Sequence, residues 1–150
     1  TTVSGWAEGF FAAAVKRAGQ ALELRLAIER VFDAEPEALI AICGDFNAED
    51  HDTALRLACA GEDDTGSGRL APRVLTPVER TLPTDRRFTV LHHGRPAMLD
   101  HILASRALFA HFVDVEIHNE MLEDELVAYG RINHPPESLH APVVAIFDFA

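Results

Sequence analysis

The first stretch of the chain repeats apolar residues at helical spacing. Phe11, Ala18, Ile28 and further apolar positions recur every three or four residues, and charged side chains occupy the positions between them. This period predicts an amphipathic helix over residues 7–33. We expect Ser4 to cap its N-terminus and Pro36 to end it.

An uninterrupted apolar run follows at residues 39–43, and Gly44 closes it. A run this short is typical of a strand that is buried on both faces. Cys43 lies inside the run, so we expect its thiol to be a small core side chain. A helix followed by a buried strand indicates a layered α/β protein.

The middle of the chain carries weaker patterns. Residues 52–60 predict a short helix, and residues 62–68 predict a solvated loop because they are rich in Asp, Ser and Gly. The segment that continues to Thr84 is rich in Pro and Arg. We expect this segment to be an irregular insertion that lies over the surface.

The rest of the chain predicts four strands, at residues 88–92, 98–105, 112–118 and 142–149. In the third of these, apolar and polar residues alternate strictly, so one face should meet water. Pro135 and Pro136 should interrupt regular structure just before the last strand.

Length and composition narrow the class of protein. The 150 residues predict one domain over 1–150, and 48% hydrophobic with 25% charged residues is ordinary for a globular protein. No apolar run approaches the roughly 18 residues that cross a membrane, and the N-terminus does not resemble a signal peptide. We therefore expect no membrane partner, with the cytoplasm favoured. The absence of an initial Met indicates a processed or truncated chain, and two cysteines make no disulfide framework.

The net charge of the chain bears on which molecules it can bind. A chain of formal charge -11 repels the nucleic-acid backbone on average, so nucleic acid is possible as a partner but not favoured. A phosphorylated substrate stays compatible, because a bound cation reverses the local field.

The strongest chemical signal is Gly44-Asp45-Phe46-Asn47, which follows the predicted buried strand. Groups at the carboxyl end of a strand face the crevice where α/β proteins bind ligands. Asp45 can bind a hard cation or hold a water, and Asn47 can donate to a phosphate oxygen. The alternative is a plain turn in which Asp and Asn bond the local backbone.

Two further signals come later in the chain. Asp100 begins an apolar strand, where the alternative role is to cap the strand and bond its own turn. His140 precedes the last strand, and a single His at such a place is more often structural than catalytic. Each signal is weak by itself.

Taken in order, these motifs resemble the endonuclease/exonuclease/phosphatase family. Gly44–Asn47 is similar to its Gly-Asp-x-Asn motif, Asp100–Leu103 to its Asp before Ile-Leu, and Ser138–His140 to its Ser-Asp-His ahead of a Pro-Val strand. The resemblance extends to Gln20 and Arg25 on the first helix. It implies the C-terminal portion of one domain. The implied fold is α/β, half of a four-layer α/β/β/α sandwich with a mixed, mostly antiparallel sheet and helices on one face.

The resemblance also implies roles in phosphoester hydrolysis with Mg²⁺ or Mn²⁺. Asp45 would bind the metal and position the attacking water, and Asn47 would bind the scissile phosphate. His140 would move protons or stabilise charge, and Asp100 would accept a hydrogen bond from its ring and fix its tautomer. A phosphoester is anionic, so its hydrolysis needs positive charge at the phosphoryl oxygens and a base near the water.

This sequence departs from the family pattern at Leu139, where the family has Asp. The metal-binding Glu of the family comes from an N-terminal half that precedes this sequence, and Glu8 is a poor substitute. We therefore expect the isolated chain to be inactive. The alternative is a non-catalytic fragment or pseudoenzyme that acts as a binding or assembly module. The substrate class stays open among DNA, RNA, inositol phosphates and other phosphoesters.

Other candidate residues have simpler interpretations. Adjacent residues on a strand point to opposite faces, so His92 and His93 should not grip one metal ion. The acidic residues of 120–125 and the arginines of 69–87 are expected to be solvated. Ser105 and Ser138 have no base at a recognisable spacing, so a serine hydrolase is not supported.

The apolar character of the predicted strands also predicts that another protein surface packs against the sheet. If helices cover one face of the sheet, the other face would be an apolar patch larger than monomers usually tolerate. We expect a homodimer that packs sheet on sheet or the N-terminal half of the domain to cover it, unless residues 69–87 fold back over it.

Overall fold

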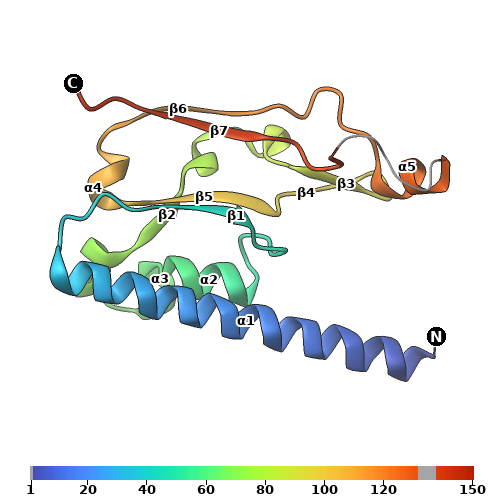
Figure 1. Ribbon diagram of the computed structural model, residues 1–150, viewed down its shortest axis with the longest axis horizontal. Helices are drawn as coiled ribbons and strands as arrows, with labels where there is room; N and C mark the ends of the chain where they lie inside the picture. The colour runs from blue at the N-terminus through green and yellow to red at the C-terminus, as the bar shows by residue number, and fades with distance from the viewer. Residues whose placement is uncertain (1, 132–137) are drawn as a thin grey trace.

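A three-stranded antiparallel sheet organises the computed structural model, which describes residues 2–131 and 138–150 (Figure 1). Its strand order is β1 (Ala41–Asp45), β5 (Asp100–Ser105) and β2 (Leu75–Pro77). The central strand β5 is therefore bonded on both edges, and β1 lies at an edge. Pro135 and Pro136 lie outside the described residues.

Two helices cover one face of this sheet (Figure 1). They are α1 (Val3–Ala34) and α2 (Thr53–Cys59), and the buried side chains between them and the sheet include Phe32, Leu55 and Leu103. The helical period thus predicted α1 and α2 correctly, and Pro36 lies just past the end of α1.

The N-terminal cap of α1 is Thr2 rather than Ser4. Thr2 has extended backbone angles, and its hydroxyl accepts a hydrogen bond from the Gly5 amide at 3.1 Å. Ser4 lies inside the helix, so the expected cap was wrong by two positions. The first turns of α1 extend beyond the sheet (Figure 1), and Trp6, Phe10 and Phe11 on them are exposed.

A two-stranded layer lies on the other side of β5. It consists of β6 (Phe112–Ile117) and β7 (Val143–Phe147), which pair antiparallel. Buried Ala104 of β5 packs in one cluster with Val115 of β6, and half-buried β7 side chains pack against that cluster. The second face of β5 is therefore covered by the chain itself, contrary to the expectation of a bare apolar face. Exposed Asp114 and Glu116 confirm the predicted wet face of β6.

The remaining elements are short. The hairpin β3 (Val90–His92) and β4 (Arg95–Ala97) turns at His93 and Gly94, which both have positive φ. A parallel bridge from Leu91 to Asp124 places α5 beside β3. The others are α3 (Glu62–Thr65), η1 (Gly68–Arg73), η2 (Val78–Thr81), η3 (Thr84–Arg86), α4 (Arg106–Phe109) and α5 (Glu125–Arg131).

The Pro- and Arg-rich segment is not a surface insertion. Its residues Leu75 to Pro77 form β2 and bond to the inner strand β5, and Val78 and Glu79 are completely buried. This prediction was wrong because only three residues pair, too few to show an alternating pattern. The neighbouring residues 62–68 are solvated as predicted, although four of them form α3.

Strand β1 is not buried on both faces. Ala41, Cys43 and Asp45 are exposed, so Cys43 is not a core residue. The continuous apolar run predicted the strand correctly, but the prediction that both of its faces are buried was wrong, because β1 lies at the open edge of the sheet.

Antiparallel sheets with helices on one face confirm the α/β class. Within the described residues every strand ladder is antiparallel, so the sheet is less mixed than expected and is divided into one three-stranded and two two-stranded units. In the part of the chain that the structure describes, no helix has both the length and the apolar character to cross a bilayer.

Candidate functional site

Two carboxylates face each other at the end of the three-stranded sheet. Asp45 is the last residue of β1, Asp100 is the first residue of β5, and the antiparallel register pairs them directly. Like charges placed opposite each other on neighbouring strands are destabilising unless something neutralises them. The register therefore creates a site that favours a cation.

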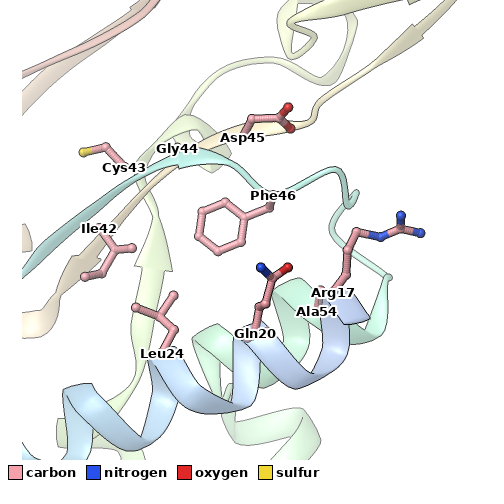
Figure 2. A pocket seen from close by; sticks show the side chains of 10 residues that line it. Arg17, Gln20, Leu24, Ile42, Cys43, Gly44, Asp45, Phe46 and Ala54 are labelled. Carbon is pink, nitrogen blue, oxygen red and sulfur yellow. The ribbon is translucent and has the colours of Figure 1, made fainter. Parts of the chain in front are cut away.

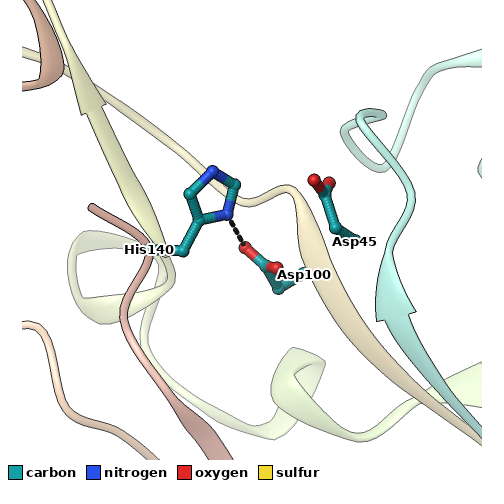
Figure 3. A group of neighbouring side chains, drawn as sticks. All are labelled: Asp45, Asp100 and His140. Atoms are coloured by element: carbon teal, nitrogen blue, oxygen red, sulfur yellow. Dashed lines mark hydrogen bonds and ion pairs between the residues drawn. The ribbon is translucent and has the colours of Figure 1, made fainter. Parts of the chain in front are cut away.

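His140 reaches this pair from the loop before β7. Its Nδ1 donates to Asp100 Oδ2 at 2.7 Å, which confirms the predicted contact between them (Figure 3). Because Nδ1 is committed to the carboxylate, Nε2 is directed away from Asp100. The backbone amide of His140 also donates to Ser138 Oγ at 3.1 Å, which holds the loop in place.

Asp45, Asp100 and His140 each offer one ligand atom, and these atoms all lie within 4.8 Å of one another. The two carboxylate oxygens suit a hard divalent ion such as Mg²⁺ or Mn²⁺, while the Nδ1–H of His140 is bonded to Asp100 and orients that carboxylate. His140 and Asp100 are half-buried and Asp45 is exposed, so the group remains open to solvent.

Asn47 is attached to this group through Asp45. Its backbone amide donates to Asp45 Oδ1 at 2.8 Å, and its side-chain Nδ2 donates to Asp45 Oδ2 at 3.0 Å. Asn47 has a φ of 46°, a left-handed conformation that Asn tolerates better than most residues. The plain local turn considered above is thus present, and it also orients the Asp45 carboxylate toward the site.

Two hydrogen bonds anchor the turn after β1 to β5 and to the residue before it. The Phe46 amide donates to the Leu99 carbonyl at 2.8 Å, and His101 Nε2 donates to the Ala48 carbonyl at 2.8 Å. On its other side, His101 Nδ1 contacts Glu79 Oε1 at 2.5 Å. Burial alone would lower the pKa of His101, but the hydrogen bond and charge of Glu79 outweigh it, so the pKa lies above its usual value.

Neither member of this buried pair was identified as a site residue from the sequence. Glu79 lies in the segment that was expected to cover the surface, and His101 carried no signal except its place after Asp100. An acidic side chain amid Pro and Arg residues is usually solvated, so only the fold could bring it inside.

Glu125 is a further carboxylate at the site. Its Oε1 lies 3.9 Å from His140 Nε2, and its Oε2 lies 3.1 Å from His92 Nδ1. The prediction that the acidic residues of 120–125 are only solvated was therefore wrong for Glu125, and for Asp124, which accepts hydrogen bonds from the Gly94 and Leu126 amides. No local pattern could indicate this contact, because Glu125 of α5 meets His140 only in the folded chain.

Several arginines of residues 69–87 are held in ion pairs rather than left solvated. Arg73 pairs with Glu29 and Asp33 on α1, while Arg80 and Arg87 pair with Asp50. These contacts neutralise nearby carboxylates and tie the segment to the rest of the fold.

Ser105 accepts from the Ile40 amide and donates to the Ala38 carbonyl, so its hydroxyl has a structural role. Arg25, part of the family resemblance, donates to the carbonyls of Ala58 and Arg73 and is also structural.

A cavity of about 300 Å³ lies between α1 and β1, on the side of the strand opposite to the Asp45 carboxylate (Figure 2). Arg17 and Gln20 of α1 and Phe46 line it together with apolar side chains. Asp45 also borders this cavity, although its carboxylate and the Phe46 ring point to opposite sides of the chain (Figure 2).

Comparison with known proteins agrees with this geometry. The model of the Endonuclease/Exonuclease/phosphatase family matches residues 6–121, well over half of the chain. The match includes Asp45, Asn47 and Asp100, and His140 lies beyond it but is joined to them by its bond to Asp100. No significant match to a curated protein or to a solved structure was found. On the family match, the chain belongs to the endonuclease/exonuclease/phosphatase family.

Proposed function

We propose that this chain contributes the Asp45, Asn47, Asp100 and His140 side chains of a metal-dependent phosphoester hydrolase. The observation that carries this proposal is the approach of Asp45, Asp100 and His140 from three separate strands and loops to within 4.8 Å. The family is generally one of metal-dependent phosphoesterases and nucleases. Convergence alone would also suit a metal site without catalysis, so the family supplies the reaction class.

The donor set fits a hard divalent ion. Asp45 and Asp100 would hold Mg²⁺ or Mn²⁺ through carboxylate oxygens, which both ions prefer. When bound, such an ion neutralises charge on phosphoryl oxygens and makes the phosphorus more open to attack. The acidic charge of the chain favours a small phosphoester over a nucleic acid.

The side chains then have distinct roles. Asp45 orients the attacking water and accepts its proton, because its carboxylate already faces the open side of the group. Asn47 has a second amide hydrogen free of its bond to Asp45, and this hydrogen donates to a phosphoryl oxygen. His140 donates from Nε2 toward the phosphoryl group, and Asp100 fixes its orientation through Nδ1.

The chain alone is expected to turn over little or no substrate. Leu139 supplies no acidic oxygen next to His140, and exposed Glu8 is on the outer part of α1 rather than at the carboxylate pair. We expect a further metal-binding carboxylate, which the family resemblance implies, to complete the group beside Asp45 and Asp100 in an active enzyme. The same observations favour the second candidate, a module that binds metal or a partner without catalysis.

Metal titration followed by a hydrolysis assay tests the proposal. Mn²⁺ binding to the chain is measured by electron paramagnetic resonance, for the wild type and for Asp45→Asn and Asp114→Asn. We expect Asp45→Asn to weaken binding and exposed Asp114→Asn, away from the site, to leave it unchanged. Hydrolysis of bis-p-nitrophenyl phosphate is then measured with this chain and with the longest chain of the protein that can be expressed.

The outcomes separate the two candidates. Turnover that needs Mn²⁺ and disappears in Asp45→Asn supports the hydrolase. Metal binding that depends on Asp45 without turnover in the longest chain supports the binding module. Equal Mn²⁺ affinity in all three proteins would show that the carboxylate group is not a metal site.

A further inference from the structure

A buried ionic pair lies next to the candidate site, on the face of strand β5 opposite to Asp100. The side chains of His101 and Glu79 are 1% and 2% exposed, and their closest atoms, Nδ1 and Oε1, are 2.5 Å apart. Burying two ionisable groups costs free energy that hydrophobic side chains of similar size would not cost. The stability of the fold alone therefore does not explain why this pair is buried.

The pair is fully engaged with backbone groups on both sides. Glu79 Oε2 accepts from the Ile102 amide at 3.5 Å, while His101 Nε2 donates to the Ala48 carbonyl at 2.8 Å. The ring also packs edge-on against Phe46, with their centroids 5.7 Å apart. One imidazole thus connects the η2 segment, strand β5 and the turn after β1.

That turn contains the site residue Asn47. The residues on either side of Asn47, Phe46 and Ala48, both contact His101, and Asn47 itself has left-handed backbone angles. Asp100 and His101 are successive residues of β5, so their side chains point to opposite faces of the strand. One face of β5 presents Asp100 to the site, and the other holds the turn that carries Asp45 and Asn47.

We infer that His101 and Glu79 are positioning residues, which hold Asn47 and Asp45 in register with Asp100 by fixing the Ala48 carbonyl. The idea extends the proposed function, because the site it serves is the metal and phosphoester site described above. Loss of a group that hydrogen-bonds a metal ligand directly weakens metal binding by about 10- to 100-fold, and we expect the lower end of this range for a pair that acts through the Ala48 carbonyl.

The turn itself is the primary readout, since it does not depend on metal. In ¹⁵N-labelled chain without metal, the side-chain amide of Asn47 and the backbone amides of Phe46 and Glu49 are followed by NMR. The variants are His101→Phe, Glu79→Ala and Glu79→Gln. Gln retains the length of Glu79 and can donate to His101 Nδ1 while Nε2 still donates to Ala48, so it should restore the contact that Ala removes.

Ser105→Ala is the matched control. Ser105 is also a buried polar residue of β5, but it bonds the Ala38 carbonyl at 2.7 Å, at the end of the strand away from Asp100. We expect the control to lower the melting temperature and leave the Asn47 signals in place. His101→Phe and Glu79→Ala should shift these signals and weaken Mn²⁺ binding about tenfold or more, and Glu79→Gln should retain both.

Unchanged Asn47 signals in both His101→Phe and Glu79→Ala would overturn the inference, as would equal shifts in Ser105→Ala. If His101→Phe does not fold, the Ala and Gln variants at Glu79 decide the matter by their difference. The two proposals fail separately. Wild-type chain that binds no Mn²⁺ contradicts the metal site, while Asn47 signals that respond only to His101 and Glu79 still support the positioning role.

Discussion

His140 Nδ1 lies 2.7 Å from Asp100 Oδ2, although 40 positions separate the two residues in sequence. The bond makes the orientation of the imidazole depend on Asp100. We predict that Asp100→Asn weakens Mn²⁺ binding and, in a complete enzyme, lowers kcat by about 10²- to 10⁴-fold, the range for a positioned acid or base. Steady-state kinetics measures the loss, and the ¹⁵N shifts of the His140 ring report its tautomer. An unchanged tautomer and rate would show that the bond is only structural.

Leu139 precedes His140 where the family has Asp. We predict that Leu139→Asp increases Mn²⁺ affinity, because it adds a carboxylate beside the three ligand atoms of the group. Leu70→Asp, an exposed Leu on η1, is the control for added charge. Calorimetric titration compares the two. Equal affinity in both variants would mean that a carboxylate at position 139 does not reach the metal.

The two cysteines should differ sharply in reactivity. Burial raises the pKa of the Cys59 thiol to about 12, and burial also raises the pKa of Cys43, although that side chain is exposed. At pH 8 a disulfide reagent should modify Cys43 slowly and leave Cys59 untouched, since the thiolate is the reactive form. Mass spectrometry after timed quenching locates the label, and urea should expose the second thiol. Equal labelling of both in the native chain would contradict the buried position of Cys59.

Arg25 should contribute strongly to stability. Its guanidinium is buried and bonds Glu29 and the carbonyls of Ala58 and Arg73. Arg25→Met keeps the apolar stem but removes the donor to the Ala58 and Arg73 carbonyls, while Glu29 keeps its pair with Arg73. We predict a loss of about 3 kcal/mol in the free energy of unfolding, measured with urea.

Arg56→Met is the matched control, because Arg56 makes a comparable contact with Asp64 on the exposed surface. Its urea midpoint should shift much less than that of Arg25→Met. Similar midpoints for the two variants would show that the Arg25 contacts do not stabilise the fold.

Association should depend on the outer turns of α1. Trp6, Phe10 and Phe11 are exposed there, and an apolar patch of this kind favours a partner, for which we propose a second copy of the chain. For the isolated chain we predict a molar mass that rises with concentration in light scattering, and that Trp6→Glu reduces this rise. Leu70→Glu, which changes an exposed Leu elsewhere, should have a smaller effect. A concentration-independent monomer would exclude self-association through this surface.

Local pattern was sufficient for the elements with a clear period. The long helix, the short helix that ends at Cys59 and the alternating strand β6 all follow from repeated apolar positions. Strand β2 could not be predicted, because three residues are too few for a pattern and its partner β5 lies more than twenty positions later. The exposure of Cys43 depends on strand order, which an apolar run does not encode.

The candidate site was predictable where motif order carried information. Asp45, Asp100 and His140 were identified together and converge in the structure. Glu79 and Glu125 were missed because each joins the site through long-range packing. A Glu on a short polar segment has the same local signal whether it is solvated or directed inward.

The outer turns of α1 also have a consequence for the motion of the helix. A helix without tertiary contacts is marginally stable in water at lengths below about 12–15 residues, so these turns should open and close far more often than the part around Phe32, which is buried against the sheet. Their amide hydrogens should therefore exchange rapidly with solvent while those near Phe32 exchange slowly. Any molecule that covers Trp6 and Phe10 would slow that exchange. The exchange rate of these amide hydrogens therefore shows whether a partner is bound to the outer turns of α1.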